Sequence, residues 1–296
     1  MINKKCLAVL SVVLLIAASA VAQKSRGIIF AVVNDGKQIE PIAVIKNGKL
    51  SGVGDDVIKS ENKPNFVKNH YKPRTQYNLI FGGDNAGTVK VVKDLSDTEC
   101  ASNQAEVSIQ SNRVKPQGFV MALATDLRAK RSENGVRRLP LITERTKIEE
   151  LLMAEMKDKN VPVKNTNEFR YHNLTKIDVD NDGDFEFVGS YWYNTSDKKR
   201  SLLFFIADKN AKGGFTLNFK KFQEYEEENV MSKDIKDLDK GLYHELLLDV
   251  FDYDGDGTGE IFTVTQAFEG NNFNVYKRAG GKWSRVLETS SYHCAF

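Results

Sequence analysis

The sequence predicts a mainly β protein made of antiparallel sheets, with one amphipathic helix near residues 146–157. Short runs rich in β-branched and aromatic residues occur throughout the chain, which is typical of strands. Turn signals built from Asn, Asp and Gly separate these runs, and the clearest is Asn34-Asp35-Gly36 between two apolar segments. Further tight turns are expected at Asn47-Gly48 and Gly280-Gly281.

The predicted helix has a start signal and an apolar face. Thr146 and Glu149 have the spacing of a capping box, in which each side chain bonds the backbone N–H of the other residue. The apolar side chains that recur at three- and four-residue spacing are Ile148, Leu151, Leu152 and Met156. We expect this face to pack against a sheet, and we assign the helix no chemistry.

Residues 1–22 have the three parts of a secretory signal peptide. Lys4 and Lys5 precede an apolar run, and the small residues Ala20-Val21-Ala22 form a cleavage site. The run is shorter than the roughly 20 residues that span a bilayer. No later segment is long and apolar enough to cross a membrane. We therefore expect export to the periplasm or the extracellular space, with no membrane span.

Composition divides the rest of the chain into three regions. Residues 23–125 are rich in strand signals, residues 126–160 combine a linker with the helix, and residues 161–296 contain an internal repeat. The polar stretch 52–76 is expected to be a surface loop. The charged stretch 224–240 is expected to be an insertion in the repeat region, with a helical tendency.

Charge and cysteine content exclude some classes of partner. The chain has 42 Lys and Arg against 40 Asp and Glu, and removal of Lys4 and Lys5 with the signal peptide makes the balance even. The basic residues are scattered, whereas nucleic-acid binding requires a basic stripe, so no nucleic-acid partner is expected. Cys100 and Cys294 remain after export, and the sequence leaves two states open: a disulfide or two free thiols.

Two nine-residue stretches indicate a metal site each. DVDNDGDFE runs from Asp178 to Glu186 and DYDGDGTGE from Asp252 to Glu260, and both read D-x-D-x-D-G-x-x-E. Alternating carboxylates on a tight loop can converge on one centre, and Ca²⁺ takes six to eight oxygen ligands. The backbone carbonyls at the seventh position, those of Asp184 and Thr258, would complete each shell. An ordinary Asp-Gly turn is the alternative for a single loop, but the repeated spacing favours metal.

The flanks of the two loops exclude an EF-hand. That motif has a bidentate Glu at position twelve and a helix on each side, whereas position twelve here is Gly189 or Thr263. The flanking segments are rich in β-branched and aromatic residues and are predicted to be strands.

A strand–loop–strand unit with acids at positions one, three, five and nine resembles the FG-GAP (VCBS-like) repeat, which builds blades of integrin α-type β-propellers. The resemblance covers about residues 165–290 and implies propeller-like blades in the C-terminal half, with two bound Ca²⁺ ions. The implied side-chain ligands are Asp178, Asp180, Asp182 and Glu186 for one ion, and Asp252, Asp254, Asp256 and Glu260 for the other. The chain departs from the family in having Glu at the ninth position and in lacking the Phe-Gly…Gly-Ala-Pro signature.

Two such units cannot close a ring, because four blades is the usual minimum. We expect the N-terminal strands to supply further, degenerate blades. A smaller β assembly is the alternative.

No catalytic residue is predicted. The chain lacks the G-x-S-x-G and nucleotide-binding motifs, and His172 and His244 lie at different offsets before the two loops. The aromatic residues Tyr171, Tyr191, Trp192 and Tyr193 are compatible with a sugar- or peptide-binding surface, or with strand packing. We expect a calcium-stabilised binding or scaffolding module with a protein or glycan partner. The alternative is a hydrolase that acts on polysaccharide or another envelope substrate.

Overall fold

The computed structural model of the chain describes residues 26–53, 61–129 and 137–294. The predicted signal peptide and part of the predicted linker lie outside these ranges. The described residues form three antiparallel sheets and a few helices, so the predicted mainly β class is confirmed. None of the helices in the described ranges is both long and apolar enough to cross a membrane.

The N-terminal strands close into a six-stranded antiparallel barrel with the neighbour order β1-β7-β4-β5-β6-β2, and β2 returns to pair with β1. Strand β3 pairs with β2 outside the ring, and helix α3 follows it in the chain. The bounds are β1 Gly27–Val33, β2 Gln38–Lys46, β3 Lys49–Gly52, α3 Lys63–His70, β4 Gln76–Phe81, β5 Asp84–Asp94, β6 Ala105–Gln110 and β7 Ala122–Thr125.

The C-terminal half contains two four-stranded sheets in which every strand pairs with its neighbours in the chain: β8 to β11 in one sheet and β12 to β15 in the other. Helix α4 precedes them and helix α5 lies between them in sequence. The bounds are α4 Ile142–Asp158, β8 Arg170–Ile177, β9 Glu186–Ser196, β10 Lys199–Lys209, β11 Phe215–Glu226, α5 Lys236–Asp239, β12 Glu245–Phe251, β13 Glu260–Ala267, β14 Gly270–Ala279 and β15 Lys282–Tyr292.

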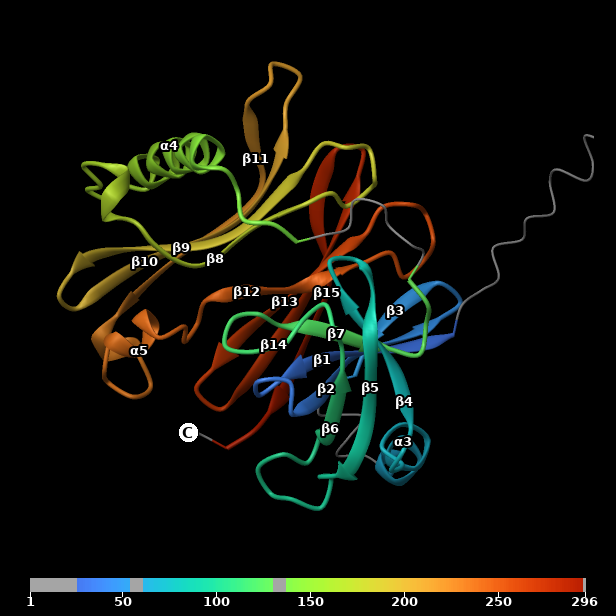
Figure 1. Cartoon of the computed structure of the whole chain (residues 1–296). Helices are drawn as coiled ribbons and strands as arrows, with labels where there is room; N and C mark the ends of the chain where they lie inside the picture. The colour runs from blue at the N-terminus through green and yellow to red at the C-terminus, as the bar shows by residue number, and fades with distance from the viewer. Residues whose placement is uncertain (1–25, 54–60, 130–136, 295–296) are drawn as a thin grey trace, which may run out of the picture.

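These elements stack in four layers: helix α4, the β8–β11 sheet, the β12–β15 sheet and the barrel (Figure 1). Successive residues of a strand point to opposite faces, so a strand between two layers is apolar on both. On β10, Phe205 packs in the cluster under α4 while Phe204 faces the β12–β15 sheet. On β12, Leu247 faces the β8–β11 sheet while Leu248 packs against the barrel.

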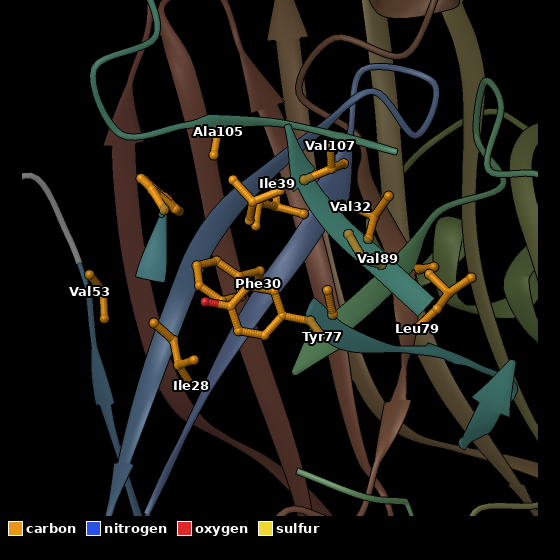
Figure 2. Packing of buried hydrophobic residues seen from close by; sticks show 14 of the residues in the cluster. Ile28, Phe30, Val32, Ile39, Val53, Tyr77, Leu79, Val89, Ala105 and Val107 are labelled. Atoms are coloured by element: carbon orange, nitrogen blue, oxygen red, sulfur yellow. The ribbon is translucent and has the colours of Figure 1, made fainter. Parts of the chain in front are cut away.

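The barrel has a filled apolar interior. Ile28, Phe30 and Val32 of β1 point inward and meet side chains from the other barrel strands (Figure 2). The Phe30 and Tyr77 rings lie 4.9 Å apart between centroids. The intervening residues Ile29 and Ala31 point outward into the cluster shared with the β12–β15 sheet. Both faces of β1 are therefore buried, which explains its uninterrupted apolar sequence.

The expectation that the N-terminal strands form further propeller blades is wrong. Those strands form a closed barrel, which buries one apolar face in its interior. The other apolar face is buried against the β12–β15 sheet. The two four-stranded sheets stand as a pair. Their outer faces are covered by α4 and by the barrel (Figure 1).

The predicted turns are confirmed. Asn34, Asp35 and Gly36 have φ values of 49°, 53° and 77°, and they join β1 to β2. Gly280 and Gly281, at 57° and 74°, join β14 to β15. Positive φ at consecutive positions matches the right-handed twist of a hairpin.

Two local predictions need correction. Helix α4 begins at Ile142, four residues before the predicted capping box, and the backbone N–H of Leu141 donates to Glu144 at 2.8 Å. Thr146 lies inside the helix and donates to the carbonyl of Ile142. The stretch 52–76, predicted to be a surface loop, contains helix α3. Pro64 resembles a loop signal, but Pro is tolerated in the first turn of a helix.

A disulfide joins Cys100 to Cys294, with 4.8 Å between their Cα atoms. It links the segment between β5 and β6 to the end of the described chain, 194 residues away. The charged stretch 224–240 contains α5, and Val230, Ile235 and Leu238 from this stretch pack on Trp192 and Leu202.

A buried carboxylate holds the barrel to the β12–β15 sheet. Asp249 of β12 is fully buried, and both of its oxygens accept the backbone N–H of Gly82, at 3.0 and 2.9 Å. Arg137 lies nearby and donates to the carbonyls of Met121 and Leu248. Burial raises the pKa of Asp249 to about 6, while the charge of Arg137 and the N–H donors act in the opposite direction.

We predict that Asp249→Ala lowers the free energy of unfolding by roughly 2–4 kcal/mol, because it leaves the Gly82 N–H without an acceptor and Arg137 without a countercharge. Asp249→Asn keeps an acceptor and should cost less. Urea unfolding in chelator measures both, with the exposed Asp97→Ala as the control. Equal stability of Asp249→Ala and the control would show that this contact does not hold the layers together.

Candidate metal centres

Each acidic loop joins two neighbouring strands of one sheet. The first lies between β8 and β9 and the second between β12 and β13, and the ninth residue of each motif, Glu186 or Glu260, is the first residue of the following strand. The sixth residues, Gly183 and Gly257, have φ values of 87° and 95°. This left-handed conformation is costly for other residues, so glycine permits the tight turn.

The two loops share a hydrogen-bond pattern. The first Asp accepts the N–H of the sixth residue, at 3.0 Å between Asp178 and Gly183 and at 3.1 Å between Asp252 and Gly257. The ninth residue accepts the N–H of the second with its Oε2, at 3.1 Å for Glu186 and 3.3 Å for Glu260. Glu therefore uses one oxygen to close the loop, and its Oε1 accepts from a basic side chain, Arg278 at Glu186 and Lys277 at Glu260.

Three carboxylates converge in each loop. One oxygen each from Asp178, Asp180 and Glu186 lie within 4.8 Å of one another, and Asp252, Asp254 and Glu260 form the matching set. These two acidic clusters could hold a metal ion. In the first, the Oδ1 atoms of Asp178 and Asp180 are buried and lack a hydrogen-bond donor. Buried polar atoms are nearly always satisfied, so this arrangement fits a bound cation.

The other predicted ligands are placed differently. The Oδ1 of Asp182 accepts the N–H of Asp184 at 2.7 Å, and the Oδ1 of Asp256 accepts the N–H of Thr258 at 2.9 Å. Neither Asp182 nor Asp256 belongs to the three-carboxylate sets found among the described residues. The carboxylate of Asp184 pairs with Lys209. The roles of Asp182, Asp256 and the carbonyls of Asp184 and Thr258 remain predictions.

Two basic residues at the end of β14 face the loops, and the sequence alone did not reveal them. Lys277 contacts Asp254, Asp256 and Glu260 of the second loop at 2.9, 2.7 and 2.5 Å. Arg278 crosses to the other sheet, where it pairs with Asp180 and, at 2.9 Å, with Glu186. Neighbouring strand residues point to opposite faces, so this adjacent pair serves two loops. The sequence signal is the Lys-Arg pair before the Gly280-Gly281 turn.

Burial governs the protonation of the ninth residues. It raises the pKa of Glu186 and of Glu260 to about 7, against backbone donors and the charges of Arg278 and Lys277, which lower it. Burial also raises the pKa of Asp180. These carboxylates are costly to ionise at neutral pH without a compensating cation.

The loops contact each other directly. The N–H of Gly259 in the second loop donates to the carbonyl of Val179 in the first, at 2.7 Å. A Cβ atom at position 259 would lie 2.3 Å from Cγ1 of Val250, so glycine fits where the second loop passes β12. Both clusters therefore lie at one edge of the interface between the two four-stranded sheets.

The two histidines that precede the loops form an aromatic cluster. The His172 and His244 rings lie 4.5 Å apart and pack on Trp192. His244 is fully buried, and burial lowers its pKa to about 3, so its imidazole is neutral. Within the described part of the chain, no acid or Cys joins these rings in a three-ligand metal cluster. Ser190 lies 3.3 Å from Nδ1 of His244 and is buried as well.

We predict that the metal-free protein loses stability as the pH rises from 5 to 8. The folded-state pKa of Glu186 and Glu260, about 7, exceeds the unfolded value of 4.5, so the folded state retains protons that the unfolded state has released. Thermal unfolding in chelator across this range measures the effect. The stability of the double variant Glu186→Gln/Glu260→Gln should depend less on pH than that of the wild type. Equal pH dependence would contradict the assignment of this effect to the two Glu residues.

Comparison with known proteins adds no relative. No protein-family model matches the chain, and no curated protein and no solved structure is detectably similar to it. The likeness to FG-GAP repeats therefore rests on the two acidic loops and their flanking strands. What the geometry itself shows is a pair of matched carboxylate clusters held at one edge of two stacked sheets.

Proposed function

We propose that this chain is an exported calcium-binding protein that acts as a binding or scaffolding module in the cell envelope or the extracellular space. The observation that carries the proposal is the matched geometry of the two loops, each with three converging carboxylates. Within the first loop, the strongest support comes from the Oδ1 atoms of Asp178 and Asp180, which are buried and have no hydrogen-bond donor. A cation at each centre would satisfy these oxygens and remove the repulsion among the acids.

The donor set favours calcium over other metals. All the side-chain donors in both clusters are carboxylate oxygens, which suit hard cations, whereas zinc and copper sites use imidazole or thiolate. Mg²⁺ keeps several of its waters and requires a near-ideal octahedron, while Ca²⁺ accepts six to eight oxygens in flexible geometry. A loop that offers several carboxylates and carbonyls fits calcium best.

The ions would stabilise the edge where the two sheets meet. Without metal, Lys277 and Arg278 provide the compensating positive charge. A divalent ion would take over this role at each loop and release the basic side chains. Because the loops touch through Gly259 and Val179, both ions would rigidify the same edge.

The disulfide supports the exported location, since such bonds persist mainly in oxidising compartments. Cys100 and Cys294 are bonded in the folded chain, in keeping with the predicted signal peptide. The FG-GAP likeness favours a binding role, and the two calcium ions would be structural. No observation on the described residues favours the hydrolase alternative.

We predict that Asp180→Ala and Asp254→Ala each remove one of two calcium-binding events. Calorimetric titration of the chelator-stripped mature protein gives the number of events, and melting with and without Ca²⁺ gives the stabilisation. A site that is lost would forfeit about 2.7 kcal/mol at free calcium 100 times Kd. Asp184→Ala is the control, because it keeps the carbonyl and its carboxylate pairs with Lys209. Two binding events in both cluster variants would refute the ligand assignment.

We also predict that removing either basic side chain lowers the stability of the metal-free protein and raises its affinity for calcium. Arg278→Met should lower the metal-free stability by about 1–3 kcal/mol, because Glu186 loses its charged partner. The same change should raise calcium affinity at the first loop, where the ion no longer displaces a guanidinium. Lys277→Met should do the same at the second loop.

Lys282→Met, an exposed charge change on the next strand, is the control for both variants. Weaker calcium binding in both the Lys277 and Arg278 variants would show that the basic residues assist the ions and do not compete with them.

A further inference from the structure

A cavity of about 630 Å³ lies at the end of the β12–β15 sheet away from the metal centres. Its wall combines the β1–β2 turn, the segment before β7, and the ends of β13 and β14. Leu246 and Val264, which face each other across β12 and β13, line it, whereas Phe251 and Glu260 at the other end of the same strand pair flank the second acidic loop. The volume falls within the usual range for small-molecule sites.

The lining is apolar with a ring of side-chain amides. Val32, Pro116, Phe119 and Met121 contribute apolar surface, and the amides come from Asn34, Gln38, Gln104, Gln117, Gln266 and Asn271. No Lys or Arg is found among the described residues that line the cavity, and Asp35 is the one carboxylate there. His293 is the one basic side chain of that lining, and it interacts with the buried carboxylate of Glu40. An anionic ligand would therefore meet no Lys or Arg to compensate its charge.

A buried carboxylate behind the wall orients two of these amides. Glu40 is fully buried and accepts the Nδ2 of Asn271 at 2.8 Å and the Nε2 of Gln104 at 3.4 Å. Asn103 and Ser291 donate to the same carboxylate. Each amide nitrogen gives one N–H to Glu40, so its second N–H and the amide oxygen are the groups left for a ligand at Asn271 and Gln104. The site thus presents oriented amides with both donors and acceptors, which suit the hydroxyl groups of a ligand.

The lining offers few partners to a peptide ligand. Strand β1 pairs with β2 and β7, and β13 pairs with β12 and β14, so neither offers a free edge for strand addition, whereas β12 is the edge strand of its sheet and contributes only Leu246 to the described lining. A peptide carboxylate would find no Lys or Arg in the described lining. Phe119 is 38% exposed and lines the cavity, where the C–H face of a sugar ring could pack on it.

We infer that this cavity is a binding site for a neutral saccharide, held by the side-chain amides with its apolar face against Phe119. The inference rests on the proposed role as a binding module, and gives that role a site and a ligand class. The site is built for binding and not cleavage, because the second carboxylate that glycoside hydrolysis requires is absent from the described lining.

Ligand-observed NMR with the mature protein tests the inference. The probes are cellobiose, maltose and N,N′-diacetylchitobiose, with glucuronic acid and glucosamine as charged comparisons. We expect saturation transfer to at least one neutral disaccharide and less to either charged sugar. Phe119→Ala and Gln266→Ala should weaken binding about tenfold each, because both side chains are exposed in the cavity wall and their loss removes a contact there.

Gln110→Ala, an exposed glutamine on β6 outside the cavity, is the matched control and should bind as the wild type does. The inference is overturned if no neutral disaccharide binds, if a charged sugar binds better, or if the two cavity variants bind normally. Titration of the saccharide in chelator tests this site separately from the metal proposal, because none of the lining residues belongs to the acidic loops. If the protein binds a saccharide but not calcium, the saccharide site stands and the metal centres are refuted. If it binds calcium but no saccharide, the metal centres stand and the saccharide site is refuted.

Discussion

The two apolar faces of the β12–β15 sheet are the constraint on which the rest of the fold depends. A four-stranded sheet with one exposed apolar face would be unstable in water, and burial of a large apolar side chain contributes about 1.5–3 kcal/mol. In a propeller the next blade covers that face. Here the β8–β11 sheet covers the side that presents Leu247, Val250 and Ile261. The barrel covers the other side, which presents Leu248, Phe262 and Phe273. Two four-stranded sheets can therefore be stable without a closed propeller ring, because a helix and a barrel cover their outer faces.

Polar groups fix how these layers sit on one another. Apolar surfaces can slide, whereas a buried polar group is stable only where its partner lies. Between the two sheets, Glu245 accepts from Thr263, Asn274 and Tyr276 with one oxygen and from Lys221 of β11 with the other. Asp249 makes the corresponding contact between β12 and the barrel. Each interface thus contains at least one buried carboxylate whose partners lie on both sides, and such contacts favour a single register.

The two proposed sites use opposite ends of the same strands. Strand β12 has Leu246 in the cavity wall near its start and ends at Phe251, next to Asp252 of the second acidic loop. At the metal end, basic side chains from β14 meet carboxylates from both sheets. At the other end, the disulfide and the buried Glu40 hold the segments that line the cavity. Proposed ions at one end would leave the far end free for a ligand, in keeping with a structural role for calcium and a separate binding surface.

The sequence by itself determined the local features, because these depend on neighbouring residues. The β class, the tight turns at Asn34-Asp35-Gly36 and Gly280-Gly281, and the strand–loop–strand setting of both acidic motifs all follow from short patterns. Only the tertiary structure decided that the N-terminal strands form a barrel, since an apolar face does not specify which surface will cover it. For the same reason, the sequence could not place Lys277 and Arg278 on two different loops, or gather distant amides around Glu40.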